Sequence, residues 1–99
     1  LVVVTRGKHG SDVATASGLR FTKTTSDVKV VDTVGAGDSF MGGMIDAMWG
    51  MNLRGAGARE ALRSLPEEQV RAIIDRASAV SDVTVSRKGA NPPWAHELP

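Results

Sequence analysis

A glycine-rich turn lies about one third of the way along the chain, at Asp32-Thr33-Val34-Gly35-Ala36-Gly37-Asp38-Ser39-Phe40. The valines just before it predict a short strand that ends at Asp32, namely Val28, Val30 and Val31. The apolar residues after it recur at helical spacing up to about Trp49, namely Phe40, Met44, Ile45 and Met48. Free backbone N–H groups and the dipole at such a helix start form an anion site, and the small residues at 35–37 let a phosphate approach the main chain. The turn therefore predicts a phosphate-binding strand–turn–helix unit.

Asp38 places a negative charge beside this anion site, which opposes phosphate binding unless the carboxylate has a second role. One such role is to take the proton from an acceptor hydroxyl next to a transferred phosphoryl group. The alternative is that Asp38 only caps the helix, where aspartate is favoured, and that Gly35 and Gly37 are ordinary turn residues. The residues by themselves leave both interpretations open.

The chain opens on an apolar, β-branched run, Leu1-Val2-Val3-Val4. Runs of this kind suit strands covered on both faces, so we expect a buried strand of a parallel sheet over Leu1–Thr5. Because one parallel strand cannot stand alone, we expect the 99 residues to be the C-terminal part of a longer chain. Glycines at 7 and 10 predict a tight turn after this strand, followed by short strands over Ser11–Ala16 and Leu19–Thr24.

Two further helices are expected in the second half of the chain. A short one covers Arg59–Leu65, and Pro66 with two acidic residues opens a longer one that reaches about Asp82. The buried face of the longer helix is formed by Val70, Ile73, Ile74, Ala77 and Val80. Loops are expected over Met51–Ala58 and Arg87–Pro93, and a final short turn over Trp94–Leu98.

The composition excludes several classes of protein. Twelve Lys and Arg against eleven Asp and Glu leave a net charge of +1, so there is no basic field to hold nucleic acid. The absence of Cys excludes disulfide frameworks, thiolate nucleophiles and Cys-based zinc sites. No apolar run approaches the ~20 residues that a membrane helix needs. With 41% hydrophobic residues, the chain is too apolar for a disordered segment.

The turn and the Gly42-Gly43 pair after it resemble the C-terminal signature of the ribokinase-like (PfkB-type) carbohydrate and purine kinases. Two other segments resemble parts of the same family. Thr5-Arg6-Gly7-Lys8-His9-Gly10 is similar to its nucleotide loop of pattern Thr-x-Gly-x-x-Gly, and Val85–Pro93 to the closing loop of bacterial fructokinases. The resemblance implies an α/β fold, the C-terminal part of a three-layer α/β/α architecture with a mostly parallel sheet. Residues 1–99 would then be the nucleotide-binding and catalytic segment of one larger kinase domain.

By this resemblance Asp38 is the base that deprotonates the acceptor hydroxyl, and the N–H groups of Gly35, Ala36, Gly37 and Asp38 form an anion hole. The nucleotide is expected to contact Thr5, Arg6, Gly7, Lys8, His9, Gly10, Gly37, Asp38 and Ser78. The family usually carries Asn where this chain has Ser78. Taken alone, the short loop pattern favours a plain β-turn, and its order relative to the Asp32–Asp38 segment is what supports a nucleotide loop. Ser78 is equally explained as a surface residue.

Many members of the family bind a monovalent cation beside the anion hole. The matching ligands here are the Asp32 side chain and the carbonyls of Val34, Thr84, Arg87 and Gly89. Pro93 stands where the family often has a small hydroxyl residue, which removes one expected contact. The alternative is that Asp32 only caps the turn.

The sequence thus predicts an ATP-dependent kinase that phosphorylates a sugar hydroxyl, most like a bacterial fructokinase. ATP and Mg²⁺ are the expected cofactors, with K⁺ at the cation site, and the expected partner is a small-molecule sugar, with neither nucleic acid nor membrane. The full-length protein is expected to be cytoplasmic. Members of the family often dimerise, so the resemblance leaves a homodimer open, although the oligomeric state is not readable from these residues. The alternatives are a ribokinase or nucleoside kinase of the same family, and a catalytically incomplete fragment that binds nucleotide. We expect the 99 residues alone to be inactive, because the sugar-binding half of such kinases is absent.

Overall fold

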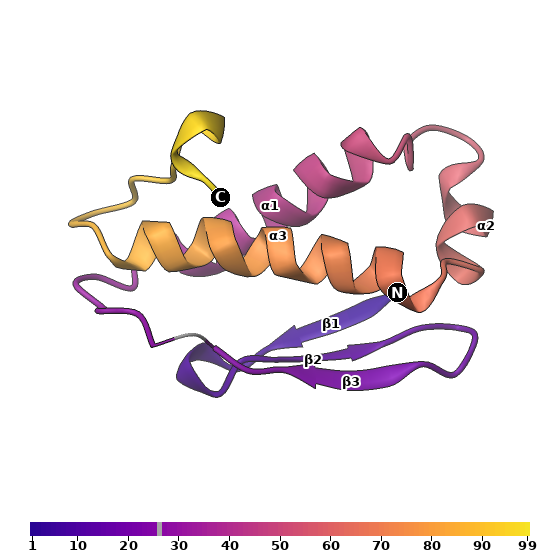
Figure 1. Cartoon of the computed structure of the whole chain (residues 1–99), viewed down its shortest axis with the longest axis horizontal. Coiled ribbons are helices and arrows are strands. Elements are labelled where there is room, and N and C mark those ends of the chain that lie inside the picture. Colours follow the sequence, from indigo (N-terminus) through magenta and orange to yellow (C-terminus); the bar gives the residue numbers. More distant parts are fainter. Residues whose placement is uncertain (26) are drawn as a thin grey trace.

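The computed structural model describes residues 1–25 and 27–99, and it orders the chain as strands first and helices second (Figure 1). The strands are β1 (Val2–Thr5), β2 (Ser11–Ala14) and β3 (Arg20–Lys23), with a 3-10 turn η1 (Gly7–His9) between the first two. The helices are α1 (Ala36–Gly50), α2 (Ala58–Arg63) and α3 (Glu67–Val85), and a 3-10 turn η2 (Ala95–Glu97) lies near the C-terminus. The expected helices are therefore present, and β2 and β3 lie within their predicted ranges.

The sheet has the order β1-β2-β3, and both of its pairings are antiparallel. Val3 lies opposite Val13, which lies opposite Phe21. The expectation that Leu1–Thr5 pairs in parallel is not met within the described residues. Tight turns join the three strands, and turns of this length permit only antiparallel pairing, whereas parallel neighbours need a long crossover. β1 is also not buried on both faces, since Val2 is 62% exposed.

No strand forms over residues 28–31, which the valine pattern predicted. The backbone there runs irregularly to the end of α3 instead. The N–H groups of Val31 and Asp32 both donate to the Val85 carbonyl oxygen, at 2.7 and 3.1 Å. These two bonds hold the entrance to the glycine-rich turn against the C-terminal end of α3.

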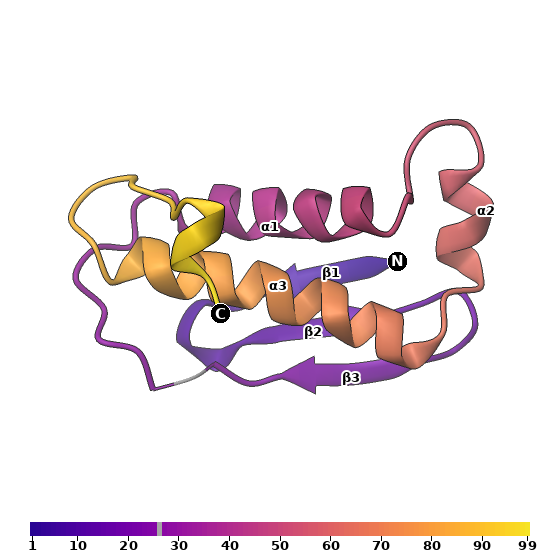
Figure 2. The ribbon, with the colours of Figure 1, turned by 45° about the horizontal axis from the view of Figure 1, so that its top comes forward.

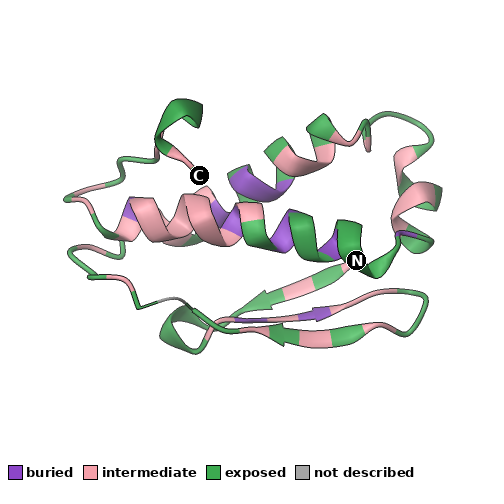
Figure 3. Ribbon diagram, viewed as in Figure 1, coloured by how far each residue is buried: buried purple, intermediate pink, exposed green. Residues whose placement is uncertain are grey.

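The helices α1 and α3 pack against each other and cover one face of the sheet (Figure 2). The core between these layers consists of Val13, Phe40, Met44, Leu65, Val70, Ile73, Ile74 and Ala77. Gly43 permits the close helix contact, because a Cβ atom there would lie 2.7 Å from the Ala77 Cα atom. Figure 3 shows the buried residues of α3 as bands along the helix, as expected from its apolar periodicity.

The helix α3 extends three residues beyond Asp82, where the sequence pattern predicted its end. Thr84 lies in this added turn and is fully buried, with its Oγ1 atom 2.9 Å from the Val80 carbonyl oxygen. This bond gives the buried hydroxyl a hydrogen-bond partner, which offsets the cost of burying a polar side chain. None of the helices in the described part of the chain is long and apolar enough to cross a membrane.

Candidate functional site

The helix α1 begins at a glycine with a left-handed backbone. Gly35 is the N-cap with φ +78°, and the first i→i−4 bond runs from the Ser39 N–H to the Gly35 carbonyl at 2.8 Å. The N–H groups of Gly37 and Asp38 precede this bond and have no acceptor within the helix. The Ala36 N–H donates to the Thr33 carbonyl at 3.2 Å, so this member of the predicted anion hole is already engaged. The first turn of α1 thus presents donors and the positive end of its dipole to an anion.

The position of Gly35 is fixed by two constraints. Its φ lies in the region that L side chains avoid, and a Cβ atom there would lie 3.1 Å from the Ala90 Cβ atom. The loop after α3 therefore sits directly against the start of α1.

Asp38 occupies the third position of α1, and its side chain is exposed. Within the described residues, no hydrogen bond or ion pair engages its carboxylate. The interpretation of Asp38 as the helix cap is therefore wrong, since the N-cap is Gly35 and no side chain caps this helix. Asp38 instead lines a cavity of about 430 Å³ between α1, α3 and the C-terminal loop, together with Ser39, Gly42, Ala90 and Pro93. A carboxylate without a partner is available as a proton acceptor.

Asp32 links the glycine-rich turn to the loop after α3. Its Oδ1 atom accepts the Val34 N–H at 3.0 Å, and its Oδ2 atom accepts the Gly89 N–H at 2.9 Å. These bonds, Val34 first, lower the pKa of the Asp32 carboxyl below its ordinary value, since they favour the ionised form. Asp32 is thus a turn cap, as the simpler interpretation has it, and also a cross-link over 57 positions of sequence.

The predicted cation ligands are only partly brought together by these contacts. Asp32, Val34 and Gly89 are neighbours, but both carboxylate oxygens of Asp32 face N–H groups. The Thr84 and Gly89 carbonyls accept the N–H groups of Arg87 and Asn91, at 3.2 and 3.0 Å. The Thr84 carbonyl also accepts the Ser86 N–H, so several of the oxygens expected to hold a hard cation are already engaged. In the described residues, three or more His, Cys, Asp or Glu side chains nowhere gather as a metal cluster.

Ser39 and Thr84 form a buried polar contact that sequence reasoning missed. The Thr84 Oγ1 atom lies 2.9 Å from the Oγ atom of Ser39, the residue that follows Asp38. Ser81 adds a bond from its hydroxyl to the Ala36 carbonyl at 3.3 Å. These hydroxyls fasten the first turn of α1 to α3. Their only trace in the sequence is a pair of small polar residues at positions 81 and 84, near and just beyond the expected end of the helix.

The predicted nucleotide loop borders a second cavity, of about 130 Å³, on the other side of the first turn of α1. Thr5, Gly7 and Gly10 line it, and Ser78 lines it from α3. The loop at positions 5–10 and Ser78 of α3, which are far apart in sequence, thus meet beside Ala36. Sequence reasoning missed further lining residues, which are Ser11, Lys23, Thr24, Thr25, Phe40, Ser81 and Asp82.

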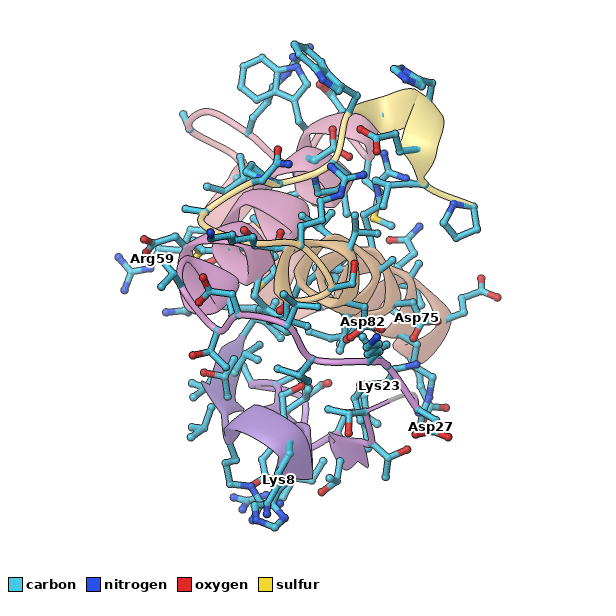
Figure 4. All side chains as sticks on the ribbon, turned by 90° about the vertical axis from the view of Figure 1, so that its left-hand side faces the viewer. Lys8, Lys23, Asp27, Arg59, Asp75 and Asp82 are labelled. Carbon is cyan, nitrogen blue, oxygen red and sulfur yellow. The ribbon has the colours of Figure 1, made fainter. Side chains whose placement is uncertain are left out.

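The charged residues of the nucleotide loop do not line this cavity. Arg6 pairs with Asp12, with its Nε atom 3.1 Å from Oδ2. Lys8 and His9 are exposed on η1, and Figure 4 shows Lys8 well away from the group formed by Lys23, Asp75 and Asp82. Lys23 bridges this rim to α3, with its Nζ atom 2.9 Å from Asp75 Oδ1.

Gly10 has a packing role in addition to any contact with a ligand. A Cβ atom there would lie 1.9 Å from the Lys23 carbonyl oxygen, and its φ is +88°. The glycine of the Thr-x-Gly-x-x-Gly pattern therefore lets the loop approach the end of β3.

Comparison with solved structures finds kinases that share this arrangement. Aminoimidazole riboside kinase from Salmonella enterica, complexed with aminoimidazole riboside and an ATP analog, is 30% identical over 89% of this chain and 26% of its own, with a TM-score of 0.68. Fructokinase from Vibrio cholerae, bound to fructose, ADP and calcium ion, is 28% identical over 91% of this chain and 26% of its own, also with a TM-score of 0.68. Ribokinase from Giardia lamblia is 27% identical over 89% of this chain and 26% of its own, with a TM-score of 0.70.

The chain thus spans about a quarter of the length of these kinases. No curated protein matches it in sequence. A family model described as pfkB family carbohydrate kinase matches residues 1–97. Since that match covers nearly every residue, including the glycine-rich turn and the loop that packs on it, the chain belongs to the pfkB family of carbohydrate kinases.

Proposed function

We propose that this chain is the nucleotide-binding and phosphoryl-transfer segment of an ATP-dependent sugar kinase. The observation that supports this most directly is the exposed carboxylate of Asp38, which has no partner within the described residues and follows the helix N–H groups of the turn. A structural cap would be hydrogen-bonded, and a pure phosphate cradle would not carry an acid at this position.

In the proposed reaction Asp38 takes the proton of an acceptor hydroxyl as its oxygen attacks the γ-phosphorus of ATP. The bond from that phosphorus to the bridging oxygen of ADP breaks, and ADP leaves. The N–H groups of Gly37 and Asp38, with the α1 dipole, stabilise the charge that develops on the transferred group.

The nucleotide is proposed to lie along the cavity that Thr5, Gly7, Gly10 and Ser78 line, with its phosphates toward the first turn of α1. Thr24, Thr25 and Ser78 offer hydroxyl groups at its rim. Mg²⁺, when bound with ATP, neutralises charge on the phosphates. We further propose that a monovalent cation, K⁺ by preference, binds at the oxygens of Asp32, Val34, Thr84, Arg87 and Gly89 and supports the anion hole.

Fructose is the acceptor that we propose first. The support comes from the likeness of the Val85–Pro93 loop to bacterial fructokinases, together with the fructose-bound relative from Vibrio cholerae. Ribose and nucleosides are the second candidates, because the other relatives are a ribokinase and an aminoimidazole riboside kinase.

The test has two stages. Isothermal titration of the 99-residue chain with ATP should show saturable binding, and Asp38→Asn should retain it. A coupled ADP assay with fructose, ribose and aminoimidazole riboside should then show little turnover by this chain, since it spans a quarter of its relatives. Absence of ATP binding would contradict the proposed nucleotide site. Rapid turnover by the 99 residues would contradict the expectation that activity requires a larger part of the kinase.

A further inference from the structure

The C-terminal segment forms one wall of the cavity that Asp38 lines. After α3 the chain turns back on itself (Figure 1), and this returning segment contributes several residues to that cavity of about 430 Å³. They are Ala90, Pro92, Pro93, Ala95 and Leu98. Apart from Leu98 they are alanines and prolines, which bury less apolar surface than larger side chains would. Apolar packing therefore holds this wall only weakly, and another contact has to fix it.

An ion pair between Arg87 and Glu97 supplies that contact. The Arg87 Nη2 atom donates to Glu97 Oε2, and Glu97 Oε1 accepts the Trp94 N–H at 3.0 Å. Within the described residues, the ion pair is the one hydrogen-bonded link between residues 92–98 and the rest of the chain. Both side chains are 27% exposed, whereas every other ion pair of the described chain has a partner that is 48% exposed or more. Solvent and salt therefore screen this pair least.

Arg87 also begins the loop that packs against the start of α1. Two residues after it, the Gly89 N–H donates to Asp32 Oδ2 at 2.9 Å. Ala90 then lies against Gly35, the N-cap of α1, where a Cβ atom would lie 3.1 Å from the Ala90 Cβ atom. The side chain that fixes the cavity wall thus belongs to the loop that touches the glycine-rich turn.

Two prolines stiffen the connection between the loop and Glu97. Pro92 and Pro93 lie between Ala90 and Glu97, and each proline ring fixes φ at about −65°. Backbone rotation at these two positions cannot absorb a displacement of Glu97. The position of Glu97 therefore influences the position of Ala90 against the start of α1.

We propose that Arg87 and Glu97 are positioning residues, whose ion pair holds the wall beside Asp38 and keeps Ala90 against Gly35. The first turn of α1 is then preformed before a nucleotide arrives, which lowers the cost of ordering it on binding. This inference rests on the proposed nucleotide site and goes beyond it, because neither side chain lines either cavity. The two side chains act through the loop between them.

Arg87→Met removes the guanidinium and keeps the aliphatic stem, so it breaks the ion pair and leaves most of the side-chain volume. In the 99-residue chain without nucleotide, we expect amide exchange measured by NMR to become about fivefold faster at Gly89 and at Ser39. The Gly89 N–H bonds to Asp32, and the Ser39 N–H bonds to the Gly35 carbonyl. The affinity for ATP, measured by titration, should fall by a similar factor.

Two further variants make the result specific. Arg87→Lys keeps the charge, and a single nitrogen of Arg87 makes the contact, so this variant should retain most of the exchange protection and of the ATP affinity. Arg63→Met is the matched control, because it breaks an exposed ion pair with Glu60 on α2, away from both cavities. It should change neither quantity. Urea unfolding checks that each variant is folded and measures its stability.

The proposal is overturned if Arg87→Met leaves exchange at Gly89 and Ser39 unchanged, or if it lowers stability without lowering the ATP affinity. It is also overturned if Arg87→Lys behaves like Arg87→Met, since the charge would then have no role. Absence of ATP binding by the parent chain contradicts the proposed nucleotide site alone. The exchange experiment contains no nucleotide and still decides whether the ion pair positions the loop.

Discussion

At the scale of the single residue, Asp38 is the proposed base. Its carboxylate is exposed and has no partner in the described part of the chain, so Asp38→Asn removes a base without breaking a structural bond. We expect unchanged unfolding and retained ATP binding, with turnover reduced about 10²–10⁴-fold in a full-length kinase that carries this segment. Urea unfolding, ATP titration and the coupled assay measure the three quantities. A large loss of stability would instead show that Asp38 is structural.

Asp32 differs from Asp38 because both of its carboxylate oxygens accept backbone N–H groups. These bonds lower its folded-state pKa, so the stability that they add is present above the unfolded pKa of about 3.9 and is lost as the pH falls through the folded value. We therefore expect Asp32→Asn to reduce the free energy of unfolding at pH 7. The difference from the parent chain should shrink below about pH 4. Urea unfolding from pH 7 to pH 2 measures it, and a difference that is constant with pH would contradict the assignment.

Two glycines of the turn should respond in opposite ways to substitution by alanine. Gly35→Ala forces a left-handed φ on alanine and brings its Cβ atom against Ala90, so we expect a loss of about 1–3 kcal/mol of stability. Gly37→Ala meets nothing within 4 Å and should leave stability nearly unchanged, while its methyl group weakens ATP binding at the anion site. Unfolding and ATP titration of both variants separate the two roles. Equal stability of both variants would show that the Gly35 conformation is not required.

At the scale of elements, the contact between α1 and α3 depends on Gly43. A Cβ atom there would lie 2.7 Å from the Ala77 Cα atom, and backbone cannot move aside as a side chain can. We expect Gly43→Ala to cost about 1–3 kcal/mol of stability through overpacking. Gly42→Ala is the matched control, since nothing lies within 4 Å of its Cβ position and alanine favours a helix by about 0.5–1 kcal/mol. Thermal unfolding measures the Tm of both variants. A Tm of Gly43→Ala equal to or above that of Gly42→Ala would contradict the close packing.

At the scale of the whole molecule, both cavities border the first turn of α1, so a nucleotide should stabilise the fold as a unit. ATP at 100 times its Kd is expected to add about 2.7 kcal/mol to the free energy of unfolding. Differential scanning fluorimetry with ATP and Mg²⁺ should therefore show a higher Tm, and K⁺ should raise it further relative to Na⁺. An α/β domain with a purely structural role would show no response to ATP.

Much of the candidate site could be predicted from local sequence, because glycine-rich turns and helix starts are local structures. The Gly35–Asp38 segment, the helix after it and the apolar face of α3 follow from residue type and spacing within a few positions. The cap interpretation of Asp38 failed because a left-handed glycine can begin a helix without a side-chain cap. The strand predicted from the valines before the turn does not form. The N–H groups of Val31 and Asp32 donate to the Val85 carbonyl at the end of α3 instead of to a neighbouring strand.

The sequence by itself determined the turn, the acid on it, the three helices and membership of the pfkB family, since each depends on residues close together in the chain. Only the tertiary structure decided the bonds from Asp32 to Gly89 and from Thr84 to Ser39, and the side of α1 that remains uncovered. Those features depend on which distant segments meet. The energy of a long-range contact resides in the pair rather than in either residue, so it becomes visible only once the chain has folded.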